Sequence, residues 1–220
     1  MKPLTEHIGR GVALRRGDVD TDQIVPAEYC KRLTKSGYQD VLFAGWRTDP
    51  AFVLNRPERS GATILVAGHN FGTGSSREHA VWALRDWGFK VVIATSFGDI
   101  FRRNALKNGL LAVQLPQPAV AELADLVDAD PAVEITADLV NEEIRAGRTR
   151  HEFSVDRRAR WLLLNGLDEI AVTLEKNDAI AGYEASRRPW LPGIHPTSPV
   201  PAANLGDRAI RADRAMEVRR

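Results

Sequence analysis

The sequence predicts an α/β domain with a mostly parallel central sheet, and three features of the chain indicate this class. Apolar runs at residues 63–67, 90–95 and 110–115 have the length and composition of buried strands. Amphipathic segments at 76–87 and 99–107 lie between these runs. Strands and helices that alternate in this way form parallel strands joined by helical crossovers.

The chain before this unit is expected to contain one strand followed by irregular structure. Residues 8–16 alternate between apolar and polar side chains well enough for a strand, which ends at an acidic turn, 18–22. Residues 26–47 are expected to form a loop with a short helix, since Gly37 and Gly45 interrupt any longer element.

The second half of the chain is expected to change from crossovers to hairpins. In order, it should form a helix, two strands, a turn with a returning strand, and two helical segments, at residues 118–129, 133–136, 139–144, 146–155, 157–164 and 168–185. A parallel unit followed by hairpin strands predicts a three-layer β/β/α domain.

This domain is expected to occupy residues 1–188, and residues 189–220 are expected to form a separate extension. A chain of 220 residues is long enough for one well-formed core. From Pro189 on, prolines, small polar residues and arginines replace the apolar residues that a core needs. Such a composition buries too little apolar surface to stay ordered by itself, so we expect the extension to be flexible.

The composition is that of an ordinary water-soluble protein, with 44% hydrophobic and 27% charged residues. A formal net charge of +1 argues against nucleic acid or an anionic membrane surface as the main partner. No stretch is long and apolar enough to span a bilayer, and residues 1–10 lack the apolar core of a signal peptide. We therefore expect a cytoplasmic protein.

Cysteine and histidine are too sparse for a metal site made by this chain alone. Cys30 is the only cysteine, which excludes an internal disulfide, a cysteine-based zinc site and a three-cysteine iron–sulfur site. The five histidines are scattered along the chain. The two that are nearest to each other in the sequence are His69 and His79, and their spacing fits no standard metal motif. No metal ligand is predicted in this chain.

A glycine-rich turn at residues 68–79, GHNFGTGSSREH, joins the first of the three apolar runs to the helix that follows it. Ser75 and Glu78 fit a capping box, which would place Ser75 at the N-cap and Ser76 and Arg77 in the first helical turn. Two hydroxyls, a guanidinium and free helix N–H groups would then meet at one point and bind an anion. A carboxylate is favoured over a phosphate, because the turn lacks the lysine of a P-loop and the third glycine of a dinucleotide-binding fingerprint. A tight connection without a ligand stays open as the alternative.

Residues 70–80, NFGTGSSREHA, resemble the signature of the mobile swivel domain of the aconitase superfamily. More closely, the chain is similar to that superfamily's small-subunit family of bacterial 3-isopropylmalate dehydratases, over roughly residues 4–190. Four further segments agree with this family in the expected order: 18–26, 42–47, 96–104 and 178–184. The resemblance implies the three-layer β/β/α swivel fold, in agreement with the order of elements.

The resemblance also implies an activity and a partner. Enzymes of this family interconvert 2-isopropylmalate and 3-isopropylmalate by dehydration and rehydration through isopropylmaleate, in leucine biosynthesis. The chain would bind no cofactor itself and would act only with a large subunit, as a heterodimer or heterotetramer. That large subunit would hold a 4Fe–4S cluster, whose exposed iron serves as the Lewis acid.

Dehydration of a hydroxy acid requires a base, a cation for the carboxylate and a Lewis acid on the leaving oxygen. By position in the motif, the resemblance gives Ser75 the role of the base, as an alkoxide, and Arg77 the role of holding a carboxylate. Ser76 and Gly74 would hold further substrate oxygens. A solvent-excluding contact with the partner would be needed to make an alkoxide accessible.

Two further segments are implied to line the site. Thr21 and Asp22 match a loop near the active-site mouth, where Asp22 has a supporting role. Tyr29, Cys30 and Lys31 match the substrate-selecting loop, in which relatives usually carry an aromatic residue, a leucine and a lysine. Cys30 stands in place of the leucine that faces the alkyl group, and a pocket change of this size shifts discrimination by about 1–3 kcal/mol.

Two other functions stay open. Cys30 leaves room for an isopropyl group but also for other alkyl groups, so a related hydro-lyase acting on citramalate or dimethylmalate is the nearest alternative. The same glycine-rich turn would suit a non-catalytic anion-binding module. Glu78 and His79 are expected to be structural, Glu78 by completing the cap and His79 by orienting the turn.

Overall fold

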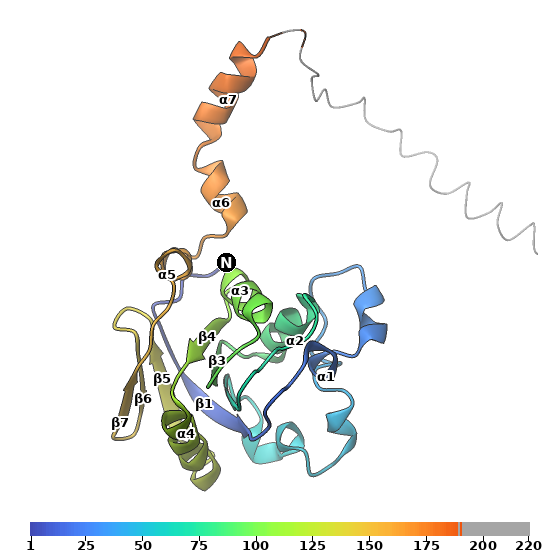
Figure 1. Ribbon diagram of the computed structural model, residues 1–220, viewed down its shortest axis with the longest axis vertical. Helices are drawn as coiled ribbons and strands as arrows, with labels where there is room; N and C mark the ends of the chain where they lie inside the picture. The colour runs from blue at the N-terminus through green and yellow to red at the C-terminus, as the bar shows by residue number, and fades with distance from the viewer. Residues whose placement is uncertain (189, 191–220) are drawn as a thin grey trace, which may run out of the picture. The chain divides into compact units, whose positions relative to one another are not determined.

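The computed structural model describes residues 1–188 and residue 190 (Figure 1). The chain divides into two units, Met1–Glu175 and Lys176–Arg220. The extension predicted for residues 189–220 lies outside the described residues, except for one residue.

The first unit is built around a sheet of seven strands in the order β4-β3-β2-β1-β5-β6-β7. The strands are β1 (Glu6–Leu14), β2 (Ile64–Ala67), β3 (Val91–Ala94), β4 (Leu111–Gln114), β5 (Glu134–Asp138), β6 (Glu143–Ala146) and β7 (Thr149–Glu152). The pairs from β1 to β4 are parallel, and the pairs from β1 through β5 and β6 to β7 are antiparallel. This order confirms the predicted α/β class, with β1 joining a parallel half to a half made of hairpin strands.

The helices of the first unit are α1 (Thr21–Ile24), α2 (His79–Trp87), α3 (Asp99–Lys107), α4 (Gln117–Ala129), α5 (Arg157–Asn165) and α6 (Glu169–Leu174), and the second unit contains α7 (Asn177–Ser186). Short 3₁₀ helices lie at Ala27–Lys31, Trp46–Thr48, Val53–Asn55 and Pro57–Arg59. None of the helices in the described part of the chain is long and apolar enough to cross a membrane.

The crossover helices lie against the parallel half of the sheet. The crossovers from β2 to β3 and from β3 to β4 run in the same direction along the sheet, so α2 and α3 lie on one face, where they contact each other. Helix α4 packs against β1 and β2. A Cβ on Gly11 of β1 would lie 2.6 Å from Val127 Cγ2 of α4, so this close approach requires glycine.

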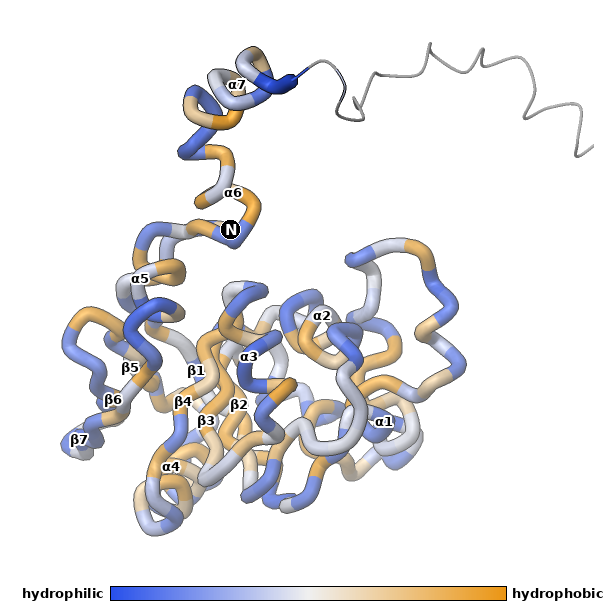
Figure 2. Tube along the Cα trace, turned by 45° about the horizontal axis from the view of Figure 1, so that its top comes forward, coloured by the Kyte–Doolittle hydropathy of each residue, from blue (hydrophilic) through white to orange (hydrophobic). Residues whose placement is uncertain are grey.

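The core lies mainly in the parallel half. All four residues of β2 and all four of β3 are buried, as expected for strands that are covered on both faces. Figure 2 shows these central strands as predominantly hydrophobic segments. The continuous apolar runs of the sequence therefore predicted the middle of the sheet correctly.

Two predicted helices differ from those observed. Helix α2 begins at His79 rather than at residue 76. The single helical segment predicted for 168–185 forms two helices, α6 and α7. Neither of these helices buries a side chain, so packing does not hold the chain in one continuous helix there.

Candidate active site

Three loops meet at the carboxyl ends of the parallel strands, which is the edge where ligands bind in sheets of this kind. They follow β1, β2 and β3 and lie at residues 15–20, 68–78 and 95–98. Backbone hydrogen bonds connect them: Asp18 N to His69 O at 2.9 Å, Gly72 N to Val19 O at 2.7 Å, Thr21 N to Thr73 O at 2.9 Å and Phe71 N to Ser96 O at 3.0 Å. The glycine-rich turn is therefore held from both sides.

Glycine is required where these loops touch. Gly72 has φ +74° and Gly74 has φ +95°, both in the left-handed region that favours glycine. A Cβ on Gly98 would lie 2.6 Å from the carbonyl oxygen of Gly72. The glycines thus let the loop after β2 lie directly against the loop after β3.

The hydroxyl of Ser75 lies beside the hydroxyl of Thr21. Their Oγ and Oγ1 atoms are 3.1 Å apart, and Thr21 Oγ1 is 3.4 Å from the carbonyl oxygen of Ser75. Thr21 is only 1% exposed, and a capping box between Asp20 and Gln23 fixes the start of its helix, α1. Ser75 itself is exposed. A buried, fixed hydroxyl therefore supports an exposed one.

The predicted capping box of Ser75 and Glu78 is wrong. Glu78 itself occupies the N-cap of α2, and no side chain makes a capping hydrogen bond there. Ser75 lies in the preceding turn with its hydroxyl next to that of Thr21, so pairing between the loops outweighs the local helix-start signal. Ser76 and Arg77 consequently precede the helix instead of forming its first turn.

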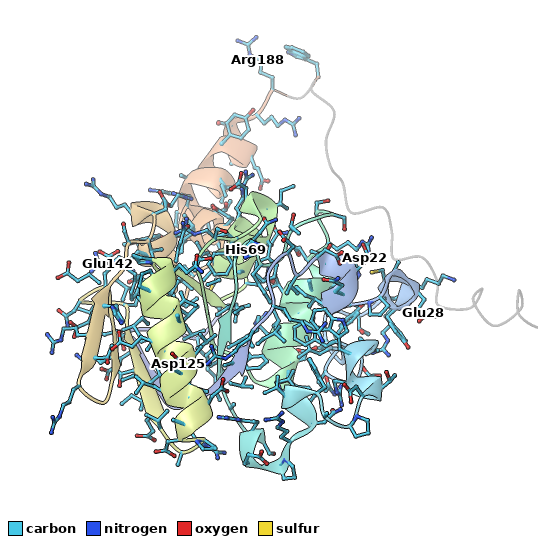
Figure 3. The ribbon with its side chains drawn as sticks, turned by 60° about the horizontal axis from the view of Figure 1, so that its bottom comes forward. Asp22, Glu28, His69, Asp125, Glu142 and Arg188 are labelled. Atoms are coloured by element: carbon cyan, nitrogen blue, oxygen red, sulfur yellow. The ribbon has the colours of Figure 1, made fainter. Side chains whose placement is uncertain are left out.

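Arg77 forms a two-pronged ion pair with Asp22 of α1. Asp22 is labelled among the side chains of Figure 3. Its Nη2 donates to Asp22 Oδ2 at 2.9 Å, and its Nη1 donates to Oδ1. The hydrogen bonds and the charge of Asp22 raise the pKa of Arg77, so the guanidinium stays cationic. The side chain of Arg77 remains 28% exposed. Because this fork uses only some of the guanidinium N–H groups, the others are available to a ligand.

Cys30 lies near Arg77, whereas its two neighbours in the sequence lie differently. The Cys30 thiol is close enough to Arg77 to add to the rise in the pKa of that guanidinium. The Tyr29 ring faces Arg32, with its centroid 5.5 Å from the guanidinium carbon, and Lys31 is exposed. Of this predicted trio, Cys30 is the member that acts on Arg77.

Three residues whose role the sequence did not reveal hold the loops of the site. Asn70 Nδ2 donates to Asp18 Oδ1 at 2.8 Å, and this bond, together with a weaker effect of His69, lowers the pKa of Asp18. Asn104 Nδ2 of α3 donates to the carbonyl oxygen of Ser76 at 3.4 Å. Asn70 has φ +54° and Asp18 has φ +52°. Asn and Asp tolerate this conformation better than most residues, which is the one signal in the sequence that points to Asn70 and Asp18.

His79 packs against aromatic rings. Its ring centroid lies 5.4 Å from that of Tyr38 and 4.8 Å from that of Trp82. Its Nδ1 atom is buried and has no hydrogen-bond partner among the described residues. Burial lowers the pKa of His79, and the charge of Arg77 lowers it further, so the ring is neutral at neutral pH. This environment fits the structural role expected for His79, although no hydrogen bond ties the ring to the turn.

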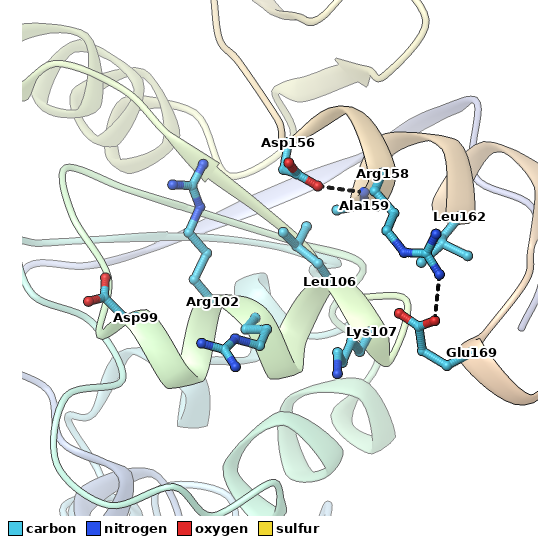
Figure 4. Close-up of a pocket in the computed structure, with 10 residues that line it drawn as sticks. Asp99, Arg102, Leu106, Lys107, Asp156, Arg158, Ala159, Leu162 and Glu169 are labelled. Carbon is cyan, nitrogen blue, oxygen red and sulfur yellow. Dashed lines mark hydrogen bonds and ion pairs between the residues drawn. The ribbon is translucent and has the colours of Figure 1, made fainter.

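The described residues fit no metal centre, and a cavity in the first unit lies apart from the site. Among residues 1–188, no three His, Cys, Asp or Glu side chains are placed to hold a metal ion. A cavity of about 320 Å³ is lined by residues of α3, α5 and α6. Figure 4 shows its wall, where Arg158 pairs with Glu169 at 2.7 Å. None of the predicted site residues lines this cavity.

Family models match both ends of the domain. The model of the aconitase C-terminal domain matches residues 1–118. The model of the C-terminal domain of the 3-isopropylmalate dehydratase small subunit matches residues 169–194.

Curated relatives and a solved structure cover most of the chain. The 3-isopropylmalate dehydratase small subunit of Thermobifida fusca is 59% identical over 192 residues, which are 87% of this chain and 98% of the relative. The protein of the same name from Streptomyces coelicolor is 57% identical over 192 residues, again 87% of this chain and 98% of the relative. The crystal structure of 3-isopropylmalate dehydratase (leuD) of Methanocaldococcus jannaschii is 29% identical, with a TM-score of 0.60, and the match covers 81% of this chain and 99% of that one. The chain therefore belongs to the family of 3-isopropylmalate dehydratase small subunits, within the aconitase superfamily.

Proposed function

We propose that Ser75 and Arg77 are the contribution of this chain to the active site of a 3-isopropylmalate dehydratase. In this proposal Arg77 binds a carboxylate of the hydroxy diacid, and Ser75 takes up the proton of the adjacent carbon. The observation that supports it best is the pairing of Ser75 with Thr21 and of Arg77 with Asp22 at the carboxyl edge of the parallel sheet. The family comparisons favour this substrate over citramalate or dimethylmalate, and they favour an enzyme over a non-catalytic anion-binding module.

Ser75 needs help to act as a base, because a serine hydroxyl is a weak acid and its alkoxide is unstable in water. The Thr21 hydroxyl, 3.1 Å away, can donate a hydrogen bond to the alkoxide. The positive charge of Arg77, two residues further along the chain, favours the same anion. Each such contribution is about 1–3 kcal/mol, which is too little for a stable alkoxide in water. Exclusion of solvent by a partner must supply the remainder.

Arg77 can hold a substrate carboxylate without leaving Asp22. The ion pair engages one edge of the guanidinium and fixes its plane. The remaining N–H groups then present a rigid donor set to a second carboxylate. Asp22 is therefore proposed to support Arg77, and Gly74 and Ser76, which are exposed, stay proposed contacts for further substrate oxygens.

The other half of this active site is proposed to come from a large subunit, which the name of the small-subunit relatives implies. The described residues of this chain do not fit an iron–sulfur cluster, since the chain has one cysteine and no suitable group of ligands among residues 1–188. We therefore propose that a 4Fe–4S cluster is held by the large subunit, in a heterodimer or heterotetramer. The lone cysteine also suits the reducing cytoplasm, which we propose as the location.

The test is co-production of this chain with its cognate large subunit under anaerobic conditions, followed by an ultraviolet assay of the unsaturated acid formed from 3-isopropylmalate. We expect turnover that needs both chains and falls by at least about a hundredfold in Ser75→Ala. Ser60→Ala is the matched control, because Ser60 is exposed and lies in a segment before β2. Full activity of Ser75→Ala would reject Ser75 as the base, and failure of the two chains to associate would reject the divided active site.

A further inference from the structure

One arginine ties the selecting loop (residues 28–37) to the rest of the domain. Arg32 Nη1 and Nη2 donate to Asp40 Oδ1 and Oδ2 at 2.8 and 2.7 Å. The same Nη1 donates to the carbonyl oxygen of Gly37, at the end of the loop. The guanidinium carbon also lies 5.5 Å from the ring centroid of Tyr29 and 5.4 Å from that of Tyr38. A single side chain therefore joins the beginning of the loop, its end and the residues beyond it.

Tyr38 packs against α2 and anchors Arg32 to the core of the domain. It is fully buried, and its backbone N–H donates to Asp86 Oδ2 of α2 at 3.0 Å. Its ring packs against the rings of His79 and Trp82 of the same helix. Its hydroxyl donates to the carbonyl oxygen of Arg32 at 3.3 Å. Because Arg32 rests on Tyr38, the loop is tied to a rigid part of the core.

The tip of the selecting loop has few ties of its own. Leu33 is fully exposed, and residues 34–36 are exposed as well. Thr34 Oγ1 donates to Ser36 O at 2.7 Å, a bond that stays within the loop. Lys35 makes one long contact with the core, with its Nζ 6.0 Å from the Trp82 ring centroid. Among the described residues, the strongest polar connection between the loop and the domain is thus that of Arg32 with Asp40.

We propose that Arg32 is the positioning residue for substrate selection. Its fork with Asp40 follows directly on the 3₁₀ turn Ala27–Lys31, which contains Cys30, and holds the end of that turn in place. Arg32 acts through this turn and does not itself touch the substrate. The part of the proposal that concerns the substrate rests on the proposed function, whereas the part that concerns the loop does not.

The loop can be tested on the isolated chain, because Cys30 is its only cysteine and reports the position of the turn. The probe is the rate of alkylation by iodoacetamide, measured over a range of pH so that a change in the pKa of the thiol is separated from a change in its accessibility. In Arg32→Lys, which keeps the charge but loses the planar fork, and in Asp40→Asn, we expect the rate to rise about threefold or more. Both variants change side chains that are at least partly exposed, so their melting temperatures should stay close to that of the wild type.

The matched control is Arg15→Lys, because Arg15 likewise makes two charged hydrogen bonds, to Asp125 and Asp128 of α4, at 2.6 and 2.7 Å. Its alkylation rate should equal that of the wild type. If Arg32→Lys and Asp40→Asn also kept the wild-type rate, Arg32 would not hold the loop and the proposal would be overturned.

The effect on selection is measured in the complex with the large subunit. We expect both loop variants to lower the ratio of kcat/KM for 3-isopropylmalate to that for citramalate by about threefold or more, mainly through KM. Faster alkylation with an unchanged ratio would overturn the role in selection. An inactive wild-type complex would instead refute the proposed function, and the alkylation rates would still decide whether Arg32 holds the loop.

Discussion

Replacement of Thr21 by valine removes one hydroxyl and changes little else. Thr21 is buried, with only 1% of its surface exposed. Valine has nearly the shape of threonine, so we expect the packing around this position to be kept. The lost hydroxyl lies 3.1 Å from Ser75 Oγ. Because Ser75 is exposed, water can replace the missing partner in the resting protein. We therefore expect the cost to appear in the reaction rather than in the fold.

The size of this effect follows from the change of charge on Ser75. A hydrogen bond between neutral groups contributes about 1 kcal/mol, and one to a charged group contributes about 1.5–3 kcal/mol. When Ser75 loses its proton, the hydrogen bond from Thr21 changes from one between neutral groups to one with a charged acceptor. The difference of about 0.5–2 kcal/mol is added to the barrier, and kcat should fall about two- to thirtyfold. The free energy of unfolding should change by about 1 kcal/mol or less.

The assay combines kcat of the complex with the large subunit and thermal unfolding of the isolated chain. The matched control is Thr173→Val, since Thr173 donates to Glu169 O at 2.9 Å on the exposed helix α6. This control should keep kcat. The reasoning is refuted if Thr21→Val keeps the wild-type kcat, or if its main effect is a loss of several kcal/mol of stability.

Two further predictions concern stability. Gly98→Ala places a Cβ 2.6 Å from the backbone oxygen of Gly72, so we expect the free energy of unfolding, measured in urea, to fall by about 1–3 kcal/mol. The control is Gly45→Ala, whose Cβ would meet nothing within 4 Å, and its free energy of unfolding should change little. Equal losses in the two variants would contradict the close contact. Burial lowers the pKa of His79 below its ordinary value of 6.5, so the unfolded chain binds the proton more readily. The stability from this group is therefore complete above that value and is lost as the pH falls below it. In His79→Phe, the unfolding free energy should fall less than in the wild type between about pH 7.5 and 5.5. Part of the fall should remain, because burial also lowers the pKa of His7. A fall equal to that of the wild type would contradict this assignment.

The sequence predicted best those features that depend on neighbouring residues. The apolar runs of β2 and β3 became fully buried strands, because a strand covered on both faces needs apolar side chains at every position. The capping box predicted at Ser75 was wrong, because a capping signal in the sequence is weak evidence for where a helix begins. A capping bond contributes about 1 kcal/mol, and contacts with other loops of the fold can replace it.

The sequence by itself determined the fold class and the family, since both rest on short motifs and on the order of elements along the chain. Only the tertiary structure decided which groups meet. Ser75 pairs with a threonine that is 54 positions away, and Arg77 pairs with an aspartate that is 55 positions away. Nothing in the local pattern identifies these partners, because parallel strands joined by a long crossover bring distant loops to the same edge of the sheet. The chemistry of the site therefore depends on strand order and register, which the packing of the whole domain sets.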